Sequence, residues 1–300
     1  MTLEQLRIFL AVAERQHVTR AAEGLGLTQS AVSAAIAALE SRHAVTLFDR
    51  VGRRIELTEA GRAFVPEAQA IIDRVETASL VLQDLSERTI GRLRAAASQT
   101  VASYWLPSRL MGFHDRFPDV DMSLSVGNTA QVARKVVEGA ADVGVVEGAV
   151  DAADLEQLIV GTDNLVVACA PDHPFTDGRD LDVATLTTTS WILREEGSGT
   201  RSEFEAWFAA LGGRLQALRV MLELPSNEAV LAAVAAGSSA SVLSGRAAAP
   251  AVALGRIAAI PLPGAMRRFF AITHRRRHRT RAVAAFSDFL KASAREERAC

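Results

Sequence analysis

Apolar residues recur at helical spacing in the first 45 residues, separated by turn signals. Residues 3–14 carry apolar side chains every third or fourth position, so one face of that helix must be buried. Thr19 offers a cap oxygen for a short second helix that ends near Leu25. Gly24 and Gly26 then permit a sharp turn into a third helix.

The third helix is expected to begin after Thr28, whose hydroxyl caps it. Val32, Ile36 and Leu39 point inward. Small or polar residues occupy the open face: Gln29, Ser30, Ser33, Ala34 and Ala37. A helix with such a face is suited to probing another molecule.

The segment Leu47–Leu57 predicts a short hairpin, because apolar residues alternate on both sides of Gly52. Arg50, Arg53 and Arg54 surround that glycine at the tip. The pattern indicates a basic wing beside the helices.

From Thr58 the chain runs about 30 residues without a strong turn signal, as far as Gly91. Its apolar residues fall alternately four and three apart: Phe64, Ala68, Ile71, Val75, Ala78, Leu82 and Leu85. A helix of that length spans about 45 Å, and Pro66 is a candidate kink near its start. The heptad seam favours a partner helix from a second copy of the chain. The alternative is a core helix of one domain.

After residue 91, short apolar runs alternate with helical segments, which is typical of an α/β fold with open sheets. The expected strands are Leu93–Ala97, Met122–Val126, Val143–Val146, Leu165–Ala170, Trp191–Leu193, Val220–Leu224, Ala240–Leu243 and Phe269–Thr273. In such folds ligands bind beyond the carboxyl ends of the strands.

Short polar clusters follow several of these strands. They comprise Ser98, Gln99 and Thr100; Asn128 and Thr129; Arg194, Gly197, Ser198, Gly199, Thr200 and Arg201; Ser226 and Asn227; and Ser244. Hydroxyls and main-chain N–H groups at helix starts, supplemented by Arg194 or Arg201, suit a small anion. A ligand-free alternative exists for Ser98, Thr129, Thr200 and Ser226, which are equally good N-caps.

Composition excludes several classes of function. Net charge is −2, so non-specific coating of nucleic acid is not expected. Apolar runs are too short for a membrane helix and the N-terminus does not resemble a signal peptide, which favours a cytoplasmic protein. The two cysteines, Cys169 and Cys300, fit a buried thiol and a tail. Six scattered histidines argue against a metal site, and neither a dinucleotide fingerprint, a P-loop nor a nucleophile elbow is present. We therefore expect neither an enzyme nor a bound cofactor.

The run His274–Arg281 reads HRRRHRTR and lies between a predicted strand and a predicted amphipathic helix. We interpret it as a solvated loop. A contact surface for a partner and an auxiliary DNA patch are the alternatives.

Six motifs make the N-terminal segment resemble the LysR-type transcriptional regulators: FLAVA from Phe9, AAEGL from Ala21, TQSAVS from Thr28, ALE from Ala38, LFDR from Leu47 and LTEAG from Leu57. The resemblance extends over the whole chain. It implies a winged helix-turn-helix over residues 1–60, a linker and dimerisation helix over 61–90, and an effector-binding domain over 91–300. That domain resembles a periplasmic binding protein of two lobes, lobe I over 92–161 and 266–300 and lobe II over 162–265.

The same resemblance implies roles for individual residues. DNA contacts fall on Thr28, Gln29, Ser30, Ser33, Arg50, Arg53 and Arg54. The effector site falls on Ser98, Gln99, Thr100, Asn128, Thr129, Arg194, Ser198, Gly199, Thr200 and Arg201. The implied partners are double-stranded DNA, a second copy in a homodimer or homotetramer, and a small, anionic effector. RNA polymerase is a further candidate partner.

The chain departs from the family pattern in two places. Ala34, Ala35 and Ala37 stand where members commonly carry long polar side chains, which predicts more reliance on phosphate contacts and DNA shape. His17 and Ala44 stand where glycine is frequent, which puts local turn geometry in question. Two rival functions stay open: an architectural DNA binder without an effector, and a solute-binding or enzymatic α/β protein. The stretch from Ser98 to Pro107 looks like the branch that contains regulators of carbon fixation and sulfur assimilation.

Overall fold

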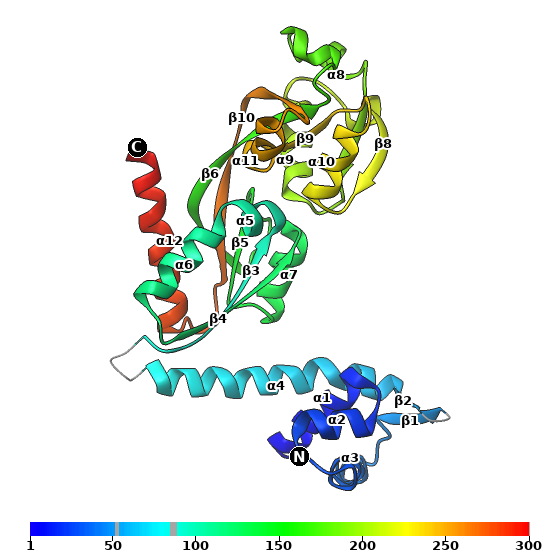
Figure 1. Ribbon diagram of the computed structural model, residues 1–300. Coiled ribbons are helices and arrows are strands. Elements are labelled where there is room, and N and C mark those ends of the chain that lie inside the picture. The colour runs from blue at the N-terminus through cyan, green and yellow to red at the C-terminus, as the bar shows by residue number, and fades with distance from the viewer. Residues whose placement is uncertain (52–53, 85–88, 300) are drawn as a thin grey trace. The chain divides into compact units, whose positions relative to one another are not determined.

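The computed structural model describes residues 1–51, 54–84 and 89–299, which form two compact units, Met1–Leu85 and Ser86–Cys300 (Figure 1). No helix in these described ranges is long and apolar enough to cross a membrane. The long helix belongs to the first unit, so the chain divides after it.

Three helices open the first unit: α1 (Leu3–Arg15), α2 (Val18–Leu25) and α3 (Gln29–His43). The expected cap at Thr28 is confirmed, since its hydroxyl accepts a hydrogen bond from the Ala31 N–H at 3.2 Å. The expected cap at Thr19 is wrong. His17 caps α2 instead, with its Nδ1 accepting from the Arg20 N–H at 3.4 Å, so the helix begins one residue before Thr19.

The predicted hairpin is present as β1 (Phe48–Val51) and β2 (Arg54–Leu57), while its tip at 52–53 lies outside the described residues. Thr58 then starts α4 (Glu59–Asp84), because its hydroxyl accepts from the Gly61 N–H at 2.9 Å.

The first half of α4 packs within its own unit. Phe64, Ala68 and Ile71, the first three positions of the predicted heptad seam, contact the core formed by α1, α3 and the hairpin. Val75 is half-buried and Ala78 is exposed; the side chain of Leu82 and all of Leu85 lie outside the description. The N-terminal half of α4 is therefore a core helix of its own unit, and the partner helix from a second copy stays a prediction.

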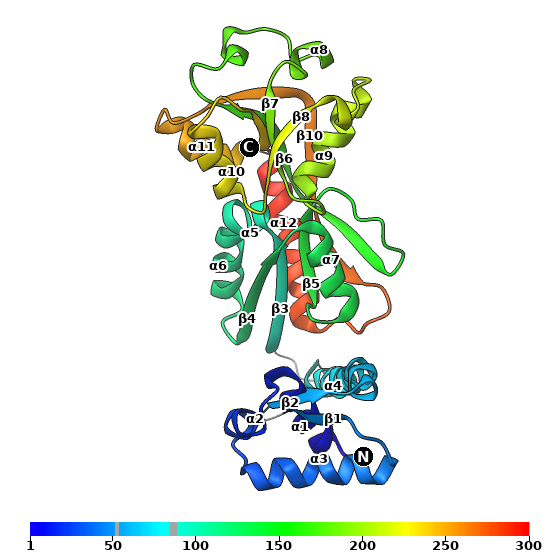
Figure 2. The same cartoon turned by 90° about the vertical axis from the view of Figure 1, so that its right-hand side faces the viewer.

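The second unit is an α/β fold built on a six-stranded sheet of order β4-β3-β5-β10-β6-β9 and a two-stranded sheet β7-β8 (Figure 2). Its strands are β3 (Gly91–Ser98), β4 (Val120–Gly127), β5 (Val143–Glu147), β6 (Leu155–Cys169), β7 (Ser190–Arg194), β8 (Arg219–Leu224), β9 (Ser241–Ser244) and β10 (Ala258–His274). Its α-helices are α5 (Gln99–Tyr104), α6 (Leu106–Arg116), α7 (Thr129–Glu138), α8 (Val183–Leu186), α9 (Gly199–Ala210), α10 (Asn227–Ala235), α11 (Gly245–Ala253) and α12 (Arg281–Ala299).

Two long strands, β6 and β10, pair antiparallel to each other and extend through both lobes of this unit (Figure 1). Lobe I gathers β3, β4, β5, α5, α6, α7 and α12 around one end of the pair, and lobe II gathers the remaining elements around the other. The predicted crossings at 161–162 and 265–266 fall inside these strands. Both strands are longer than predicted, because polar residues at mid-strand, Asp163 and Arg267 among them, interrupt the apolar pattern.

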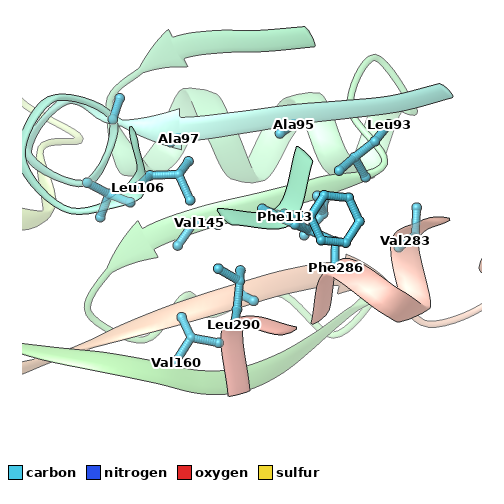
Figure 3. Close-up of a cluster of buried hydrophobic side chains, with 14 of the residues drawn as sticks. Leu93, Ala95, Ala97, Leu106, Phe113, Val145, Val160, Val283, Phe286 and Leu290 are labelled. Carbon is cyan, nitrogen blue, oxygen red and sulfur yellow. The ribbon is translucent and has the colours of Figure 1, made fainter. Parts of the chain in front are cut away.

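Each lobe has its own core. In lobe I, strand residues such as Leu93, Ala95 and Val145 pack against Phe113 of α6 and Phe286 of α12 (Figure 3). In lobe II, Trp191 packs with Phe204 at 5.2 Å between ring centroids. The cores are separate, and the lobes meet along the crossing strands and where helices of lobe I, such as α5, contact helices of lobe II.

Candidate DNA-binding and effector sites

The start of α3 carries the candidate DNA contacts. Thr28, Gln29 and Ser30 are exposed, and Ser33 is half-buried one turn later. The Thr28 and Ser30 hydroxyls lie 3.1 Å apart, so one of these groups orients the other. Exposed polar side chains at a helix N-terminus are suited to base edges and phosphate oxygens.

In the middle of α3, Ala34 and Ala37 are exposed and have no polar group to offer, as the sequence indicated. The exposed polar side chains of this helix therefore lie in its first turn and in its last turn, where Ser41, Arg42 and His43 are exposed.

The hairpin is fastened to the helices by a residue that the sequence analysis did not single out. Glu40 of α3 accepts hydrogen bonds from the Leu47 N–H at 2.7 Å and the Phe48 N–H at 3.2 Å. Its carboxylate therefore sets the angle between α3 and the hairpin. Arg50 and Arg54 lie in β1 and β2, and Arg53 lies outside the described residues.

Strand β3 ends at the first polar cluster of lobe I. Ser98 is buried, and its hydroxyl donates to the Val145 carbonyl at 3.4 Å instead of capping α5. Gln99 is next to it and reaches the other lobe: its Nε2 donates to the Pro225 carbonyl at 2.9 Å, and its Oε1 accepts from the Asn227 N–H at 3.2 Å.

Asn227 of lobe II is the centre of this contact. It is fully buried at the start of α10. Its Nδ2 donates to the Thr100 hydroxyl at 3.2 Å and its Oδ1 accepts from Arg194 Nη1 at 2.7 Å. One amide therefore joins lobe I to an arginine of lobe II. We call the region where these groups meet the lobe junction.

A second set of contacts joins α7 to the loop before α9. Asn128 caps α7 and also donates from Nδ2 to the Glu196 carbonyl at 3.3 Å, while the Ala130 N–H donates to the Gly197 carbonyl at 3.2 Å. Gly199 is required here, since a Cβ on it would lie 2.6 Å from the Thr129 hydroxyl oxygen. The lobes approach too closely at this point for any side chain.

Carboxylates neutralise both arginines expected at the effector site. The Arg194 guanidinium, 3% exposed, donates to Glu195 at 2.8 and 3.0 Å. Arg201 pairs with Glu205 at 2.7 Å and with Glu223. An incoming anion would have to compete with these glutamates.

The crossing strands contain a buried ion pair that the sequence analysis did not single out. Arg267 of β10 donates to Asp163 of β6 from Nε at 2.9 Å and from Nη2 at 2.7 Å. Its Nη1 donates to the Thr200 hydroxyl at 2.9 Å, and Ser244 donates to Asp163 at 3.0 Å. The sequence did contain a signal, because each of these charged residues interrupts an apolar strand. A charged side chain that is buried in a strand needs a partner of opposite charge.

Two titratable groups in this region have shifted pKa values. Burial, together with the nearby Glu228 carboxylate, raises the pKa of Tyr104 to about 12. Burial also raises the pKa of Glu203 on α9; Arg267 opposes that shift and Glu147 adds to it. Ser198 is buried at the start of the same helix, and its hydroxyl does not cap that helix. Among the described residues no cluster of histidine, cysteine and carboxylate side chains is placed to hold a metal ion.

Family models match both units. Residues 3–62 match the bacterial regulatory helix-turn-helix protein, lysR family, and residues 86–295 match the LysR substrate binding domain. The chain is 34% identical over 291 residues to the HTH-type transcriptional regulator YeiE of Escherichia coli K12, covering 96% of this chain and 97% of that protein. It is also 34% identical over 244 residues to the RuBisCO operon transcriptional regulator of Allochromatium vinosum, covering 81% and 80%.

Solved structures show the same fold. Full-length CbnR complexed with its target DNA superposes with a TM-score of 0.74 at 23% identity, covering 98% of this chain and 100% of that chain. The regulatory domain of Synechocystis PCC6803 CcmR in complex with 2-PG superposes with a TM-score of 0.62 at 29% identity, covering 68% and 97%.

Proposed function

The chain belongs to the LysR family of bacterial transcriptional regulators, and on that premise we propose that its small-molecule effector binds at the lobe junction. The family resemblance found in the sequence is confirmed, and the protein is a DNA-binding regulator with an effector-binding domain. The observation that carries the proposal is the bridge from Gln99 to the Pro225 carbonyl and the Asn227 N–H.

That bridge uses groups a ligand would use. The Asn227 N–H stands at the start of α10, where free N–H groups favour an acceptor. An effector with a carboxylate or phosphate can replace the Gln99 carbonyl oxygen there and hydrogen bond to Thr100 and Thr129 as well. Because Gln99 and Asn227 belong to different lobes, exchanging their hydrogen bonds for ligand contacts changes the free energy of lobe closure.

We infer a small anion as the effector class. Hydroxyl and amide donors dominate the junction, and the charge of Arg194 becomes available once Glu195 turns away. A regulatory domain that resembles this one at 29% identity is in complex with 2-PG, which supports a small-molecule ligand for this domain.

The effector assignment is tested by thermal shift with a panel of small carboxylates, phosphates and oxyanions on the full-length protein. A ligand at about 100 times its Kd stabilises the folded protein by about 2.7 kcal/mol and raises its Tm. Gln99→Ala and Asn227→Ala should abolish the shift, while Arg214→Gln on lobe II should keep it. If the Tm still rose with ligand in both junction variants, the effector site would lie outside the lobe junction. Absence of any shift would favour the architectural DNA binder.

The proposed DNA site comprises Thr28, Gln29, Ser30 and Ser33 of α3 with Arg50, Arg53 and Arg54 of the hairpin. Gln29 suits an adenine edge, and the arginines neutralise phosphates. Retention of fragmented genomic DNA at near-physiological salt, followed by sequencing, tests this role. Discrete, dyad-symmetric peaks support it. Gln29→Ala should weaken specific binding by about 1–3 kcal/mol and leave non-specific binding unchanged; an equal loss of both would refute base reading by Gln29.

We propose that the regulator is a homodimer that pairs into a homotetramer and bends the DNA between two sites. An apolar pocket of about 500 Å³ beside α4, lined by Leu39, Val45, Ala60 and Phe64 among others, suits a second copy. The edge strand β8 also exposes Val220, Met221 and Leu222, which an isolated sheet edge rarely does. Light scattering should give a multimer for the native chain and a smaller species for Leu222→Lys.

Cytoplasmic location follows from the proposed DNA-binding role, and contact with RNA polymerase belongs to the same proposal. No catalytic step is proposed for any residue.

A further inference from the structure

The loop between β10 and α12, His274–Arg281, carries five arginines and two histidines and contains no apolar residue. We call it the basic loop. Residues 275–279 are exposed, whereas Thr280 is buried and its hydroxyl accepts from the Val283 N–H at 3.2 Å. No acidic residue stands between Glu228 and Asp288 in the sequence.

Several of its arginines are held in place instead of moving freely. Arg277 donates to the carbonyls of Val136 and Val137 at 2.7 and 2.8 Å, at the C-terminus of α7. Arg275 Nε donates to the Leu155 carbonyl at 2.9 Å. Such contacts reduce the conformational entropy that the loop would lose on binding a partner. The solvated loop expected from the sequence is therefore exposed but ordered.

These contacts leave most of the charge in place. A backbone carbonyl accepts a hydrogen bond but does not neutralise a guanidinium, which has five donors. Among the described contacts, Glu156 pairs with Arg279 at 2.6 Å, and Asp154 accepts from the Arg275 N–H through its main-chain carbonyl and lies near His274. Within the described contacts, the four arginines Arg275, Arg276, Arg277 and Arg279 thus face these two carboxylates, and this part of the loop keeps a net positive charge.

The loop lies at the end of lobe I where the chain arrives from the DNA-binding unit. Strand β10 runs antiparallel to β5, with Ile272 opposite Gly144, and β5 runs parallel to β3. The C-terminal end of β10 therefore lies at the same end of the sheet as the start of β3, with β5 between the two strands. A short connection to a DNA-binding unit raises the effective concentration of DNA at this loop.

We propose that the basic loop is a second DNA-binding surface that contacts the phosphate backbone of the duplex held by the first unit. Arginine is suited to phosphate, and a surface of charge without apolar side chains fits a polyanion better than a protein interface, whose core is apolar. The proposal rests on the proposed DNA-binding function.

The test compares full-length variants on a fluorescent mixed-sequence duplex about 60 base pairs long, by anisotropy over a salt series. Arg275→Gln/Arg276→Gln removes two exposed charges from the loop. The matched control, Arg214→Gln/Arg256→Gln, removes two exposed charges from lobe II. Arg275→Lys/Arg276→Lys keeps the charge but changes the shape of the side chains. Tm values confirm that all variants are folded.

Each lost phosphate contact lowers the slope of log K against log salt by about 0.9, so the loop variant should lose about 2 per chain and bind roughly 60-fold more weakly at 0.1 M salt. The control should match the native protein, and the lysine variant should recover the native slope. A loop variant with the native slope would overturn the proposal and favour an acidic protein as the partner. Failure of the lysine variant to recover would also overturn it. If the native protein bound no duplex at all, the proposed function itself would fail.

Discussion

Replacing Asp163 by Asn removes the carboxylate that pairs with Arg267 at 2.7 Å. The Arg267 side chain is 0% exposed and that of Asp163 is 2% exposed, so water cannot take over the lost partner. Removing one member of a buried ion pair destabilises a protein by about 3–5 kcal/mol. The retained amide oxygen still accepts one hydrogen bond, so we expect a loss near about 3 kcal/mol, a factor of roughly 150 in the unfolding equilibrium.

The assay is urea unfolding followed by tryptophan fluorescence. All three tryptophans, Trp105, Trp191 and Trp207, lie in the second unit, so the signal reports on that unit alone. With a slope of about 2–3 kcal/mol per molar urea, the midpoint should fall by about 1–1.5 M.

The control is Asp163→Leu/Arg267→Met, which removes both charges. It should lie closer to the native protein than Asp163→Asn does, because replacing a whole buried pair by apolar residues is often near neutral. The hydroxyls of Thr200 and Ser244 lose a partner in this variant, so a loss of about 1–2 kcal/mol is still expected. A single variant that lost less than about 1 kcal/mol, or a double variant less stable than the single one, would refute the reasoning.

Three further predictions concern other parts of the chain. Ala44→Gly should stabilise the first unit by about 0.5–1 kcal/mol in calorimetry, because Ala44 ends α3 at a φ of 51°, where a Cβ is strained; a lower Tm would contradict this. In a Cys300→Ser background, native Cys169 should react with Ellman's reagent at pH 8 far more slowly than after unfolding, since it is buried and burial raises its pKa to about 11; equal rates would be contrary evidence. Because burial and Glu147 raise the pKa of Glu203, the folded state holds that proton more tightly, and the associated stability is lost as pH rises above about 4.5. Relative to Glu203→Gln, the native protein should therefore lose stability as the pH rises above about 4.5, and parallel stability curves would exclude this linkage.

Local sequence patterns were sufficient to predict most of the secondary structure and the core of the first unit. Thr28 caps α3 as predicted, and the burial of Val32, Ile36 and Leu39 follows the spacing that predicted it. Such features depend on residues a few positions apart, so periodicity and cap chemistry indicate them directly. The Thr19 error arose because a histidine can also cap a helix, through Nδ1, and the sequence does not distinguish the two positions.

The candidate effector site was only partly predictable. The sequence indicated Gln99, Thr100 and Arg194 as polar residues after strands, but gave no means to pair them with Asn227 more than 100 positions along the chain from Gln99. It also suggested free guanidinium groups at Arg194 and Arg201, whereas glutamates bind both. The carboxylate that neutralises a given arginine is decided by distance in the folded structure, and the sequence does not show that distance.

The sequence by itself determined the family, the α/β class of the second unit and the positions of most helices and strands, because these depend on local periodicity and motif spacing. Only the tertiary structure decided how far β6 and β10 extend, that Asp163 and Arg267 compensate each other at their crossing, and that Asn227 joins the two lobes. The reason is physical: a polar residue in a strand is tolerated or excluded according to the partner that the fold brings within about 3 Å of it, and that partner is rarely a neighbour in the sequence.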